Sequence, residues 1–169
     1  MTPGEFRRTM IEPGAAWTEA VCGVTSSTAA KRFLLAVAAK ESDLSHRYQV
    51  LNSGAAGPAR SFWQGEVTGG MVRGIFRFPA QRITDAGRAL CAAAHVQWNE
   101  QAIWRAIEGH DLLAYGLARL LLLTDPYAVP ETESGAWTCY MDRLWRPGAP
   151  NKPKWAPSWS KALGEYPLG

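Results

Sequence analysis

The sequence predicts a mainly α fold with a small β or loop region, on the basis of three observations. Of the 169 residues, 47% are hydrophobic and 20% are charged, a composition typical of a globular chain with one sizeable core. Apolar residues recur at helical spacing over several segments of the chain. Between residues 42 and 78 that spacing is lost and glycines become frequent. We therefore expect a helical core beside an irregular region.

The N-terminal residues predict two short helices. Thr2 and Glu5 have the spacing of a capping box, which predicts a helix over residues 3–11. Pro13 restarts the chain, because proline disrupts a helix interior, and a second short helix is expected over residues 13–21.

The next predicted helix starts at a serine cap, Ser26 or Ser27, and runs to Glu41. One of its faces is apolar and comprises Phe33, Leu34, Val37 and Ala38. Because residues four apart share a helix face, Glu41 projects one turn beyond Val37 on the same face. Helix geometry thus places a carboxylate at the edge of the core.

The segment from Ser42 to Phe78 is the least regular part of the sequence. A small hairpin is expected around Gly69 and Gly70, since a Gly-Gly pair tolerates the positive φ of tight turns. Long loops in compact domains are often functional, so we expect a site here.

Helical spacing resumes in the C-terminal half. A cap at Thr84, a cap at Asn99, a buried central helix and a cap at Ser134 predict four helices, over 84–96, 99–109, 111–125 and 134–145. We expect residues 1–146 to form a single domain. The tail, 147–169, contains prolines and tryptophans and is expected to lie extended over that domain.

Several classes of protein are disfavoured by composition and motifs. A net charge of +3 without a basic cluster predicts no nucleic-acid binding. No apolar run is long enough for a membrane span or a signal peptide. The three cysteines are expected to be reduced and buried. Neither an HExxH or paired CxxC metal pattern nor a GxSxG nucleophile is present, so we expect no metal and no cofactor.

Two carboxylates are candidate catalytic groups, Glu41 and Glu66. Burial disfavours the charged form of a carboxylate, which suits a general acid that must keep its proton near neutral pH. Glycosidases use such an acid to protonate the leaving oxygen, commonly with a second carboxylate as nucleophile or base. Alternatively, Glu41 is an ordinary helix-end carboxylate that reaches solvent, and Glu66 is a solvated side chain.

Aromatic and amide side chains near these acids suit a sugar cleft. Trp63, Phe62 and Tyr48 offer flat apolar faces for sugar rings, and Gln64 offers hydrogen bonds. Arg60 is expected either to contact an acidic peptide stem or to form a salt bridge with Glu66.

The pair Glu41-Ser42 at a helix end, followed by Ser61-Phe62-Trp63-Gln64, resembles the lysozyme-like superfamily, in particular goose-type lysozymes and soluble lytic transglycosylases. The family's motifs are Glu-Ser and Gly-x-x-Gln, so Ser61 stands where glycine is usual. Its third motif, Ala-Tyr-Asn, is matched in part by Ala114-Tyr115-Gly116. The string GPARSFWQGE is similar to small lysozyme-like proteins of tailed bacteriophages.

The resemblance implies an α+β lysozyme-like fold and cleavage of the β-1,4 bond between N-acetylmuramic acid and N-acetylglucosamine in peptidoglycan. It makes Glu41 the catalytic acid and base, with Ser42, Gln64 and Tyr115 in substrate binding. Lytic transglycosylases manage with one acid, whereas hydrolysis usually needs a second carboxylate, and both mechanisms stay open.

Two other functions also stay open: a phage virion component of the neck, tail or injection apparatus, which would contact other virion proteins, and a non-enzymatic glycan-binding module. The lack of a signal peptide predicts either the host cytoplasm with release to the cell wall, as for an endolysin, or the virion.

Overall fold

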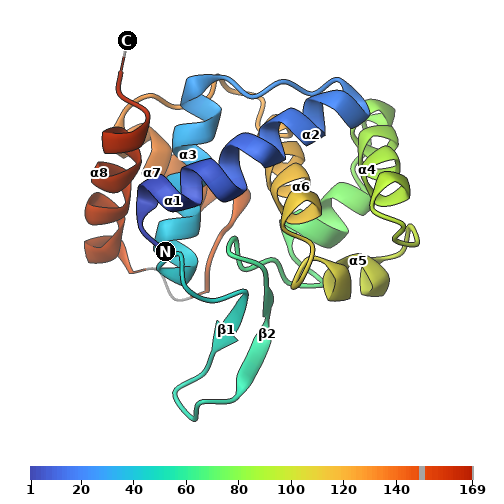
Figure 1. The fold of residues 1–169 in the computed structure, drawn as a ribbon, viewed down its shortest axis with the longest axis horizontal. Coiled ribbons are helices and arrows are strands. Elements are labelled where there is room, and N and C mark those ends of the chain that lie inside the picture. The colour runs from blue at the N-terminus through green and yellow to red at the C-terminus, as the bar shows by residue number, and fades with distance from the viewer. Residues whose placement is uncertain (149–150, 169) are drawn as a thin grey trace.

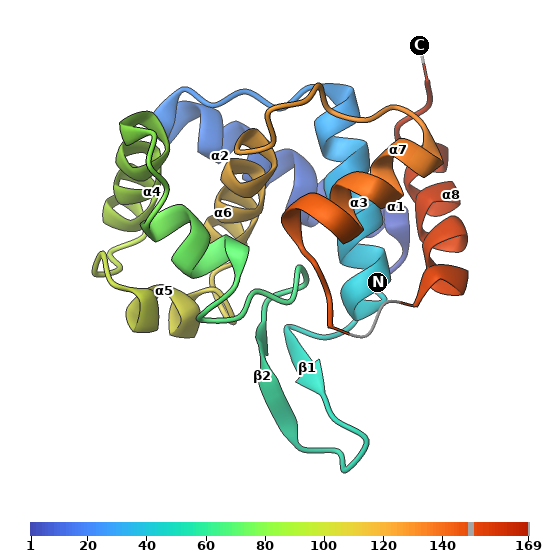
Figure 2. The same ribbon diagram turned by 180° about the vertical axis from the view of Figure 1, so that it is seen from behind.

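The computed structural model describes residues 1–148 and 151–168, and it is mainly helical with one small sheet (Figures 1 and 2). The α-helices and strands, in chain order, are α1 (Pro3–Phe6), α2 (Glu12–Cys22), α3 (Thr28–Ser42), β1 (Tyr48–Val50), β2 (Ala56–Arg60), α4 (Gln81–Ala93), α5 (Glu100–Ala106), α6 (Asp111–Leu123), α7 (Glu133–Thr138) and α8 (Trp155–Glu165). The mainly α prediction is confirmed.

Helices α1 and α2 are joined by a π-helical turn over Arg7–Ile11 rather than by a break. The expected capping box is present, with Thr2 and Glu5 bonded to each other's backbone N–H groups. The expectation that Pro13 restarts the chain is wrong. Proline has no N–H and its ring crowds the carbonyl four residues earlier, and the wider π turn just before Pro13 accommodates this without ending the helix.

Helices α3 and α6 form the centre of the molecule. Every residue of α3 from 32 to 40 is buried, and so is every residue of α6 from 113 to 122. Ser27 caps α3 by accepting a hydrogen bond from the backbone N–H of Ala30. Helix α2 crosses α6 closely, because a Cβ added at Gly14 would lie only 2.5 Å from Cγ of Tyr115. The predicted central helix is therefore confirmed as the core of the fold.

The C-terminal segment differs from the expected extended tail. It forms a 3₁₀ turn over Lys152–Lys154 and then α8, which packs along α3 (Figure 1). Trp155 and Trp159 are almost fully buried, and their rings stack on each other with centroids 6.4 Å apart. Pro153 and Pro157 lie in the first turns of the 3₁₀ segment and of α8, where proline is tolerated, and two tryptophans four residues apart share a buried helix face. The tail is thus a helix of the core.

The only sheet in the described residues is the hairpin of β1 and β2, which projects from the helical body (Figure 2). It pairs Tyr48 with Arg60 and turns through Gly54, which has φ of +81°. The predicted hairpin around Gly69 and Gly70 is wrong. A π-helical turn over Gly70–Gly74 occupies that position, because Met71 and Val72 are buried by packing against α6.

Two predicted caps are displaced. Helix α4 begins at Gln81 rather than after Thr84, and the cap of α7 is Thr132 rather than Ser134. Asn99 caps α5 as expected, by accepting a hydrogen bond from the N–H of Ala102.

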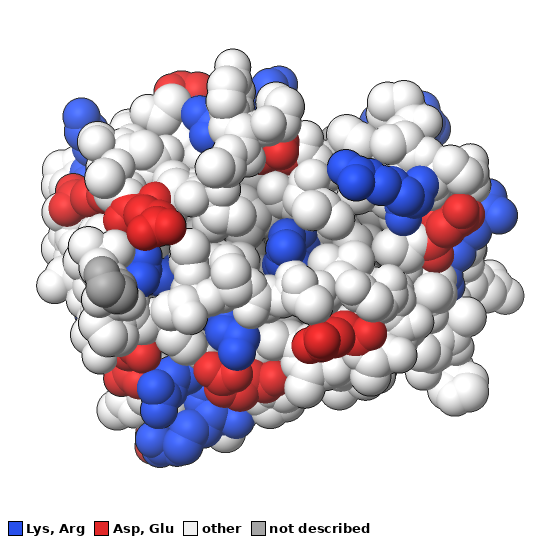
Figure 3. Space-filling model, turned by 90° about the horizontal axis from the view of Figure 1, so that it is seen from above, with Lys and Arg blue, Asp and Glu red and all other residues white. Residues whose placement is uncertain are grey.

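Charges of both signs are mixed over the surface in Figure 3, where the largest group of lysines and arginines borders acidic side chains. All three cysteines are free thiols. Within residues 1–148 and 151–168, no helix is long and apolar enough to cross a bilayer.

Candidate functional site

The end of α3 fixes the position of Glu41. The hydroxyl of Ser42 donates a hydrogen bond to the carbonyl of Ala38, at 2.8 Å, and is buried in the last turn. Asp43 and Leu44 both adopt left-handed φ values, of 51° and 56°, which end the helix abruptly. Glu41 is therefore held on a helix rather than on a mobile loop.

A tight turn from Arg60 to Gly65 carries Gln64, the second predicted site residue, to the same cavity as Glu41. The two end residues exchange both backbone hydrogen bonds, at 2.9 and 2.7 Å, and Ser61 has φ of +68°. That region favours glycine, which is the residue usual at this place in the resembled motif. Here the buried hydroxyl of Ser61 accepts a hydrogen bond from the N–H of Trp63, and this local bond supports the serine in its unusual conformation.

Glu41, Gln64 and Glu66 line one cavity of about 400 Å³, together with Lys40, Gln49 and Trp145. Gln64 and Glu66 follow Glu41 by 23 and 25 residues in the sequence, and the fold brings all three to the same cavity. Gln64 is fixed by donating its amide N–H to the carbonyl of Ser61, at 2.8 Å. Two carboxyl groups and two carboxamides thus surround one space.

Glu41 is poised to keep a proton. Burial raises the pKa of its carboxyl above the ordinary value of 4.5, and the negative charge of Glu66 adds to the rise. The hydroxyl of Tyr140, which donates a hydrogen bond to Oε1 of Glu41, and the charge of Lys40 offset part of it. The balance leaves the pKa of Glu41 raised.

Lys40 and Tyr140 are the residues that sequence reasoning missed. Burial lowers the pKa of Lys40, whose Nζ lies 3.5 Å from the Tyr140 hydroxyl and 5.6 Å from the centre of its ring. Burial also raises the pKa of Tyr140, and the adjacent Glu41 charge raises it further. Tyr140 lies 99 residues after Glu41, so no local pattern links the two. Lys40 was detectable as a neighbour in sequence, but its burial was not.

Gln49 lines this cavity, but its side-chain oxygen lies against Gly57, which is outside the lining. Its side-chain oxygen is buried and has no hydrogen-bond partner among the described residues. Gly57 makes room for it, since a Cβ at that position would lie 2.3 Å from the oxygen. A buried acceptor without a partner costs free energy.

Three of the predicted substrate-binding aromatics are in the core instead. Phe62, Trp63 and Tyr115 are at most 1% exposed. The indole N–H of Trp63 donates to the carbonyl of Leu34, at 2.9 Å, and the hydroxyl of Tyr115 donates to Ser26, also at 2.9 Å. Their rings pack edge to face with neighbouring rings rather than toward the cavity. Phe62 and Trp63 point from the turn into the core, as Tyr115 does from α6. Only Gln64 of the turn's side chains named here lines the cavity.

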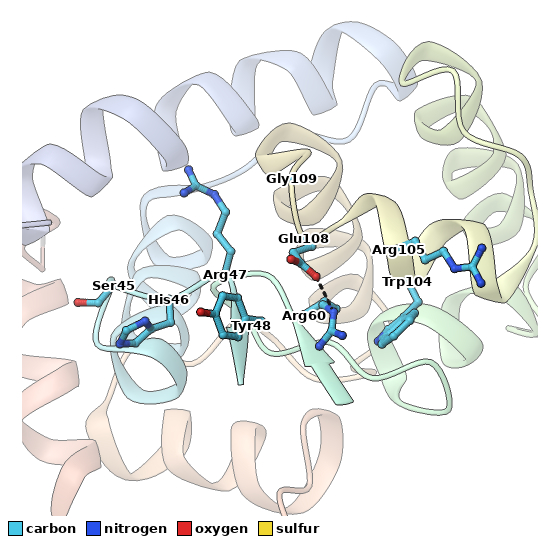
Figure 4. A pocket seen from close by; sticks show the side chains of 9 residues that line it. All are labelled: Ser45, His46, Arg47, Tyr48, Arg60, Trp104, Arg105, Glu108 and Gly109. Carbon is cyan, nitrogen blue, oxygen red and sulfur yellow. Dashed lines mark ion pairs between the residues drawn. The ribbon is translucent and has the colours of Figure 1, made fainter. Parts of the chain in front are cut away.

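Tyr48 and Arg60 lie at a different hollow, an open groove of about 740 Å³ between the hairpin and α5 (Figure 4). The expected alternative of a salt bridge between Arg60 and Glu66 is wrong, because Nε of Arg60 pairs with Glu108 at 2.6 Å. Successive side chains of a strand point to opposite faces, which explains the separation. Gln49 and Ala59 line the cavity that contains Glu41 and Glu66, here called the glutamate cavity, while their neighbours Tyr48 and Arg60 line the groove.

Over residues 1–148 and 151–168, no three His, Cys, Asp or Glu side chains gather in a way that would hold a metal ion. Comparison of the chain with protein families, with curated proteins and with solved structures finds no match.

Proposed function

We propose that the chain is a peptidoglycan-cleaving glycosidase in which Glu41 acts as general acid on the β-1,4 bond between N-acetylmuramic acid and N-acetylglucosamine. The observation that carries this proposal is a carboxyl group with a raised pKa at the wall of a cavity that also contains Gln64 and Glu66. The sequence resemblance to the lysozyme-like superfamily supports the choice of substrate.

Glu41 would donate its proton to the glycosidic oxygen while the bond from that oxygen to the sugar C1 breaks. Positive charge then develops on the sugar ring, and the new carboxylate of Glu41 lies beside it. The carboxylate next takes a proton from the attacking hydroxyl as the new bond to C1 forms. The hydrogen bond from Tyr140 suits this second stage, because it stabilises the ionised form of Glu41.

Glu66 decides between two variants of the reaction. If it positions a water molecule, the product is a hydrolysed sugar with a free reducing end. If it serves only in binding, the 6-hydroxyl of the muramyl residue attacks and closes a 1,6-anhydro ring. Its place on the same cavity as Glu41 favours hydrolysis as the first variant to test.

One carboxamide supplies a group that suits an N-acetylated sugar. The side-chain oxygen of Gln64, whose amide N–H is donated to Ser61, would accept a hydrogen bond from an acetamido N–H or a sugar hydroxyl. The indole of Trp145 borders the same space and donates its N–H to the carbonyl of Trp63, at 3.0 Å, which fixes the orientation of the ring.

The test is cleavage of purified peptidoglycan by the wild-type chain, by Glu41→Gln and by Glu66→Gln. We expect Glu41→Gln to lose on the order of a hundred to ten thousand fold in rate, the usual effect of losing a general acid. Mass spectrometry of the fragments separates reducing ends from anhydro ends.

Asp43→Asn is the matched control, because Asp43 is two residues from Glu41 but pairs with Lys154 outside the cavity. It should keep most of the activity. An inactive wild-type chain, or a Glu41→Gln variant that cleaves at the wild-type rate, would refute the proposal.

A further inference from the structure

The groove on the far side of the hairpin has the chemistry of a second binding site. Three arginines (Arg47, Arg60 and Arg105) and one glutamate line it, together with His46 and the aromatic rings of Tyr48 and Trp104. None of these residues lines the glutamate cavity. The groove is therefore a separate, cationic and partly aromatic hollow.

Arg60 is held rigidly at the centre of this groove. Its side chain is only 15% exposed, and its Nε pairs with Glu108 at 2.6 Å. Nη1 donates to the carbonyls of Gly57 and Ala59, and the guanidinium carbon lies 4.4 Å from the centre of the Trp104 ring. A guanidinium fixed in this way loses little entropy when it binds a ligand.

One edge of that guanidinium is left for a ligand. Nη2 of Arg60 donates no hydrogen bond to any residue within 1–148 or 151–168. Figure 4 shows the Arg60 side chain between Tyr48 and Trp104, with its ion pair to Glu108 marked. A planar donor beside flat rings matches a carboxylate attached to a peptide chain.

The rim of the groove adds further positive charge. Arg105 is exposed on α5 and forms no ion pair with any described residue, whereas Arg47 is paired with Asp111 through two hydrogen bonds of 2.9 and 2.8 Å. Arg105 is thus the rim cation whose charge is not neutralised, and it is suited to a second carboxylate of the same ligand.

We propose that this groove binds a carboxylate-bearing peptide, with Arg60 as the fixed central contact and Arg105 as the rim contact. The occupant is an acidic segment of a partner protein, because its apolar side chains can cover the rings of Tyr48 and Trp104. The site would bind its ligand whether or not Glu41 acts as an acid.

A peptide fits the groove better than a nucleic acid. Glu108 and Asp111 stand among the arginines and would repel a continuous phosphate backbone, and the net charge of the chain is only +3. A peptide carries isolated carboxylates between neutral groups, and its apolar side chains can pack on Tyr48, which is 39% exposed.

The experiment is fluorescence-anisotropy titration of labelled octaglutamate with the full chain, using octaglutamine as the neutral probe. We expect octaglutamate alone to bind, and Arg105→Glu to weaken it by at least about fivefold, since reversal of a rim charge replaces attraction by repulsion. Arg60→Lys should weaken it similarly, because lysine keeps the charge but loses the planar fork.

Arg82→Glu is the matched control, since Arg82 is an exposed arginine on α4 outside the groove. It should bind as the wild-type chain does. Arg105→Glu changes an exposed helix position, so it tests the proposal even if Arg60→Lys disturbs the hairpin. Circular dichroism of each variant checks the fold.

Absence of octaglutamate binding, or equal weakening by Arg82→Glu and Arg105→Glu, would overturn the proposal. So would tighter binding of a short single-stranded oligonucleotide through the same arginines. A wall stem peptide of alanine, glutamate and diaminopimelate tests the source of the ligand. Binding of octaglutamate alone supports a protein partner, and Arg105-dependent binding of the stem peptide as tight as that of octaglutamate would overturn it in favour of the wall.

Discussion

At the scale of single residues, the position of Glu41 sets the chemistry of the cavity. The carboxyl follows the apolar face of α3 by one turn, so the helix directs it toward the core rather than toward bulk water. Burial then raises the pKa of Glu41, while the hydrogen bond from Tyr140 and the positive charge of Lys40 lower it by part of that amount. The group is therefore able both to hold a proton and to take it back.

The raised pKa of Glu41 predicts how Glu41→Gln changes stability with pH. Near pH 4 the wild-type carboxyl is largely protonated when folded and unfolded, so burial carries little ionic penalty. Above the ordinary value of 4.5 the unfolded chain releases the proton first, and wild-type stability falls until the folded pKa is passed. We expect the free energy of unfolding of Glu41→Gln to exceed that of the wild type by more at pH 8 than at pH 4, as measured by urea unfolding.

Glu12→Gln is the control with the opposite sign. Burial raises the pKa of Glu12, but hydrogen bonds from Lys31 and Tyr166 outweigh it and leave the pKa lowered. That contribution is present above 4.5 and is lost as the pH falls through the folded pKa. Glu12→Gln should therefore cost more stability at pH 8 than at pH 4. Identical pH trends for the two variants would contradict the assignment of Glu41.

At the scale of elements, the fold depends on how closely α2 approaches α6. Gly14 packs against the Cβ and Cγ atoms of Tyr115. A Cβ added at Gly14 would lie 2.7 and 2.5 Å from these two atoms. These atoms are near the backbone and cannot swing away, so the helices would have to separate. Because α6 is central, such a shift would spread to the rest of the core.

Gly14→Ala is therefore expected to destabilise the chain by about 1–3 kcal/mol, the usual range for overpacking. Gly164→Ala is the matched change in α8, where nothing lies within 4 Å of the added methyl group. It should stabilise by up to about 0.5–1 kcal/mol, because alanine loses less backbone entropy in a helix. Urea unfolding of both variants measures the difference, and equal effects would show that the helices can separate freely.

At the scale of the whole molecule, the two ends of the chain are built into one structure. The guanidinium of Arg32, in α3, is buried and donates to the carbonyls of Tyr166 and Pro167, at 2.6 and 2.7 Å. Arg7, near the N-terminus, pairs with Glu165 at 3.3 Å. The Trp155 ring stacks on Tyr140, with centroids 5.0 Å apart, and so connects α8 to the residue that bonds Glu41.

A chain that ends at Gly148 is expected to lose cooperative thermal unfolding. It would expose the apolar face of α3 that α8 covers and would remove the two carbonyls to which Arg32 donates, so much of the buried apolar area would be lost. A chain that ends at Pro167 keeps both carbonyls and should melt close to the full-length temperature. Circular dichroism melting compares the two, and a sharp transition in the shorter chain would show that α8 is dispensable.

Much of the helical structure could be predicted because its signals are local. The cap of α3 at Ser27 and the cap of α5 at Asn99 depend on residues three positions apart. The hairpin was misplaced because two glycines are a weaker constraint than the burial of Met71 and Val72. The tail was expected to be extended because of its prolines, whereas the four-residue spacing of Trp155 and Trp159 is the local signal of the helix that it forms.

By itself, the sequence determined that the chain is mainly helical and that Glu41 ends a helix on its apolar side, since both follow from spacing along the chain. Only the tertiary structure decided that Glu41, Gln64 and Glu66 share a cavity, that Tyr140 donates to Glu41, and that Tyr48 and Arg60 belong to another groove. The physical reason is that pKa and ligand contact depend on burial and on neighbours distant in sequence, which local patterns do not encode.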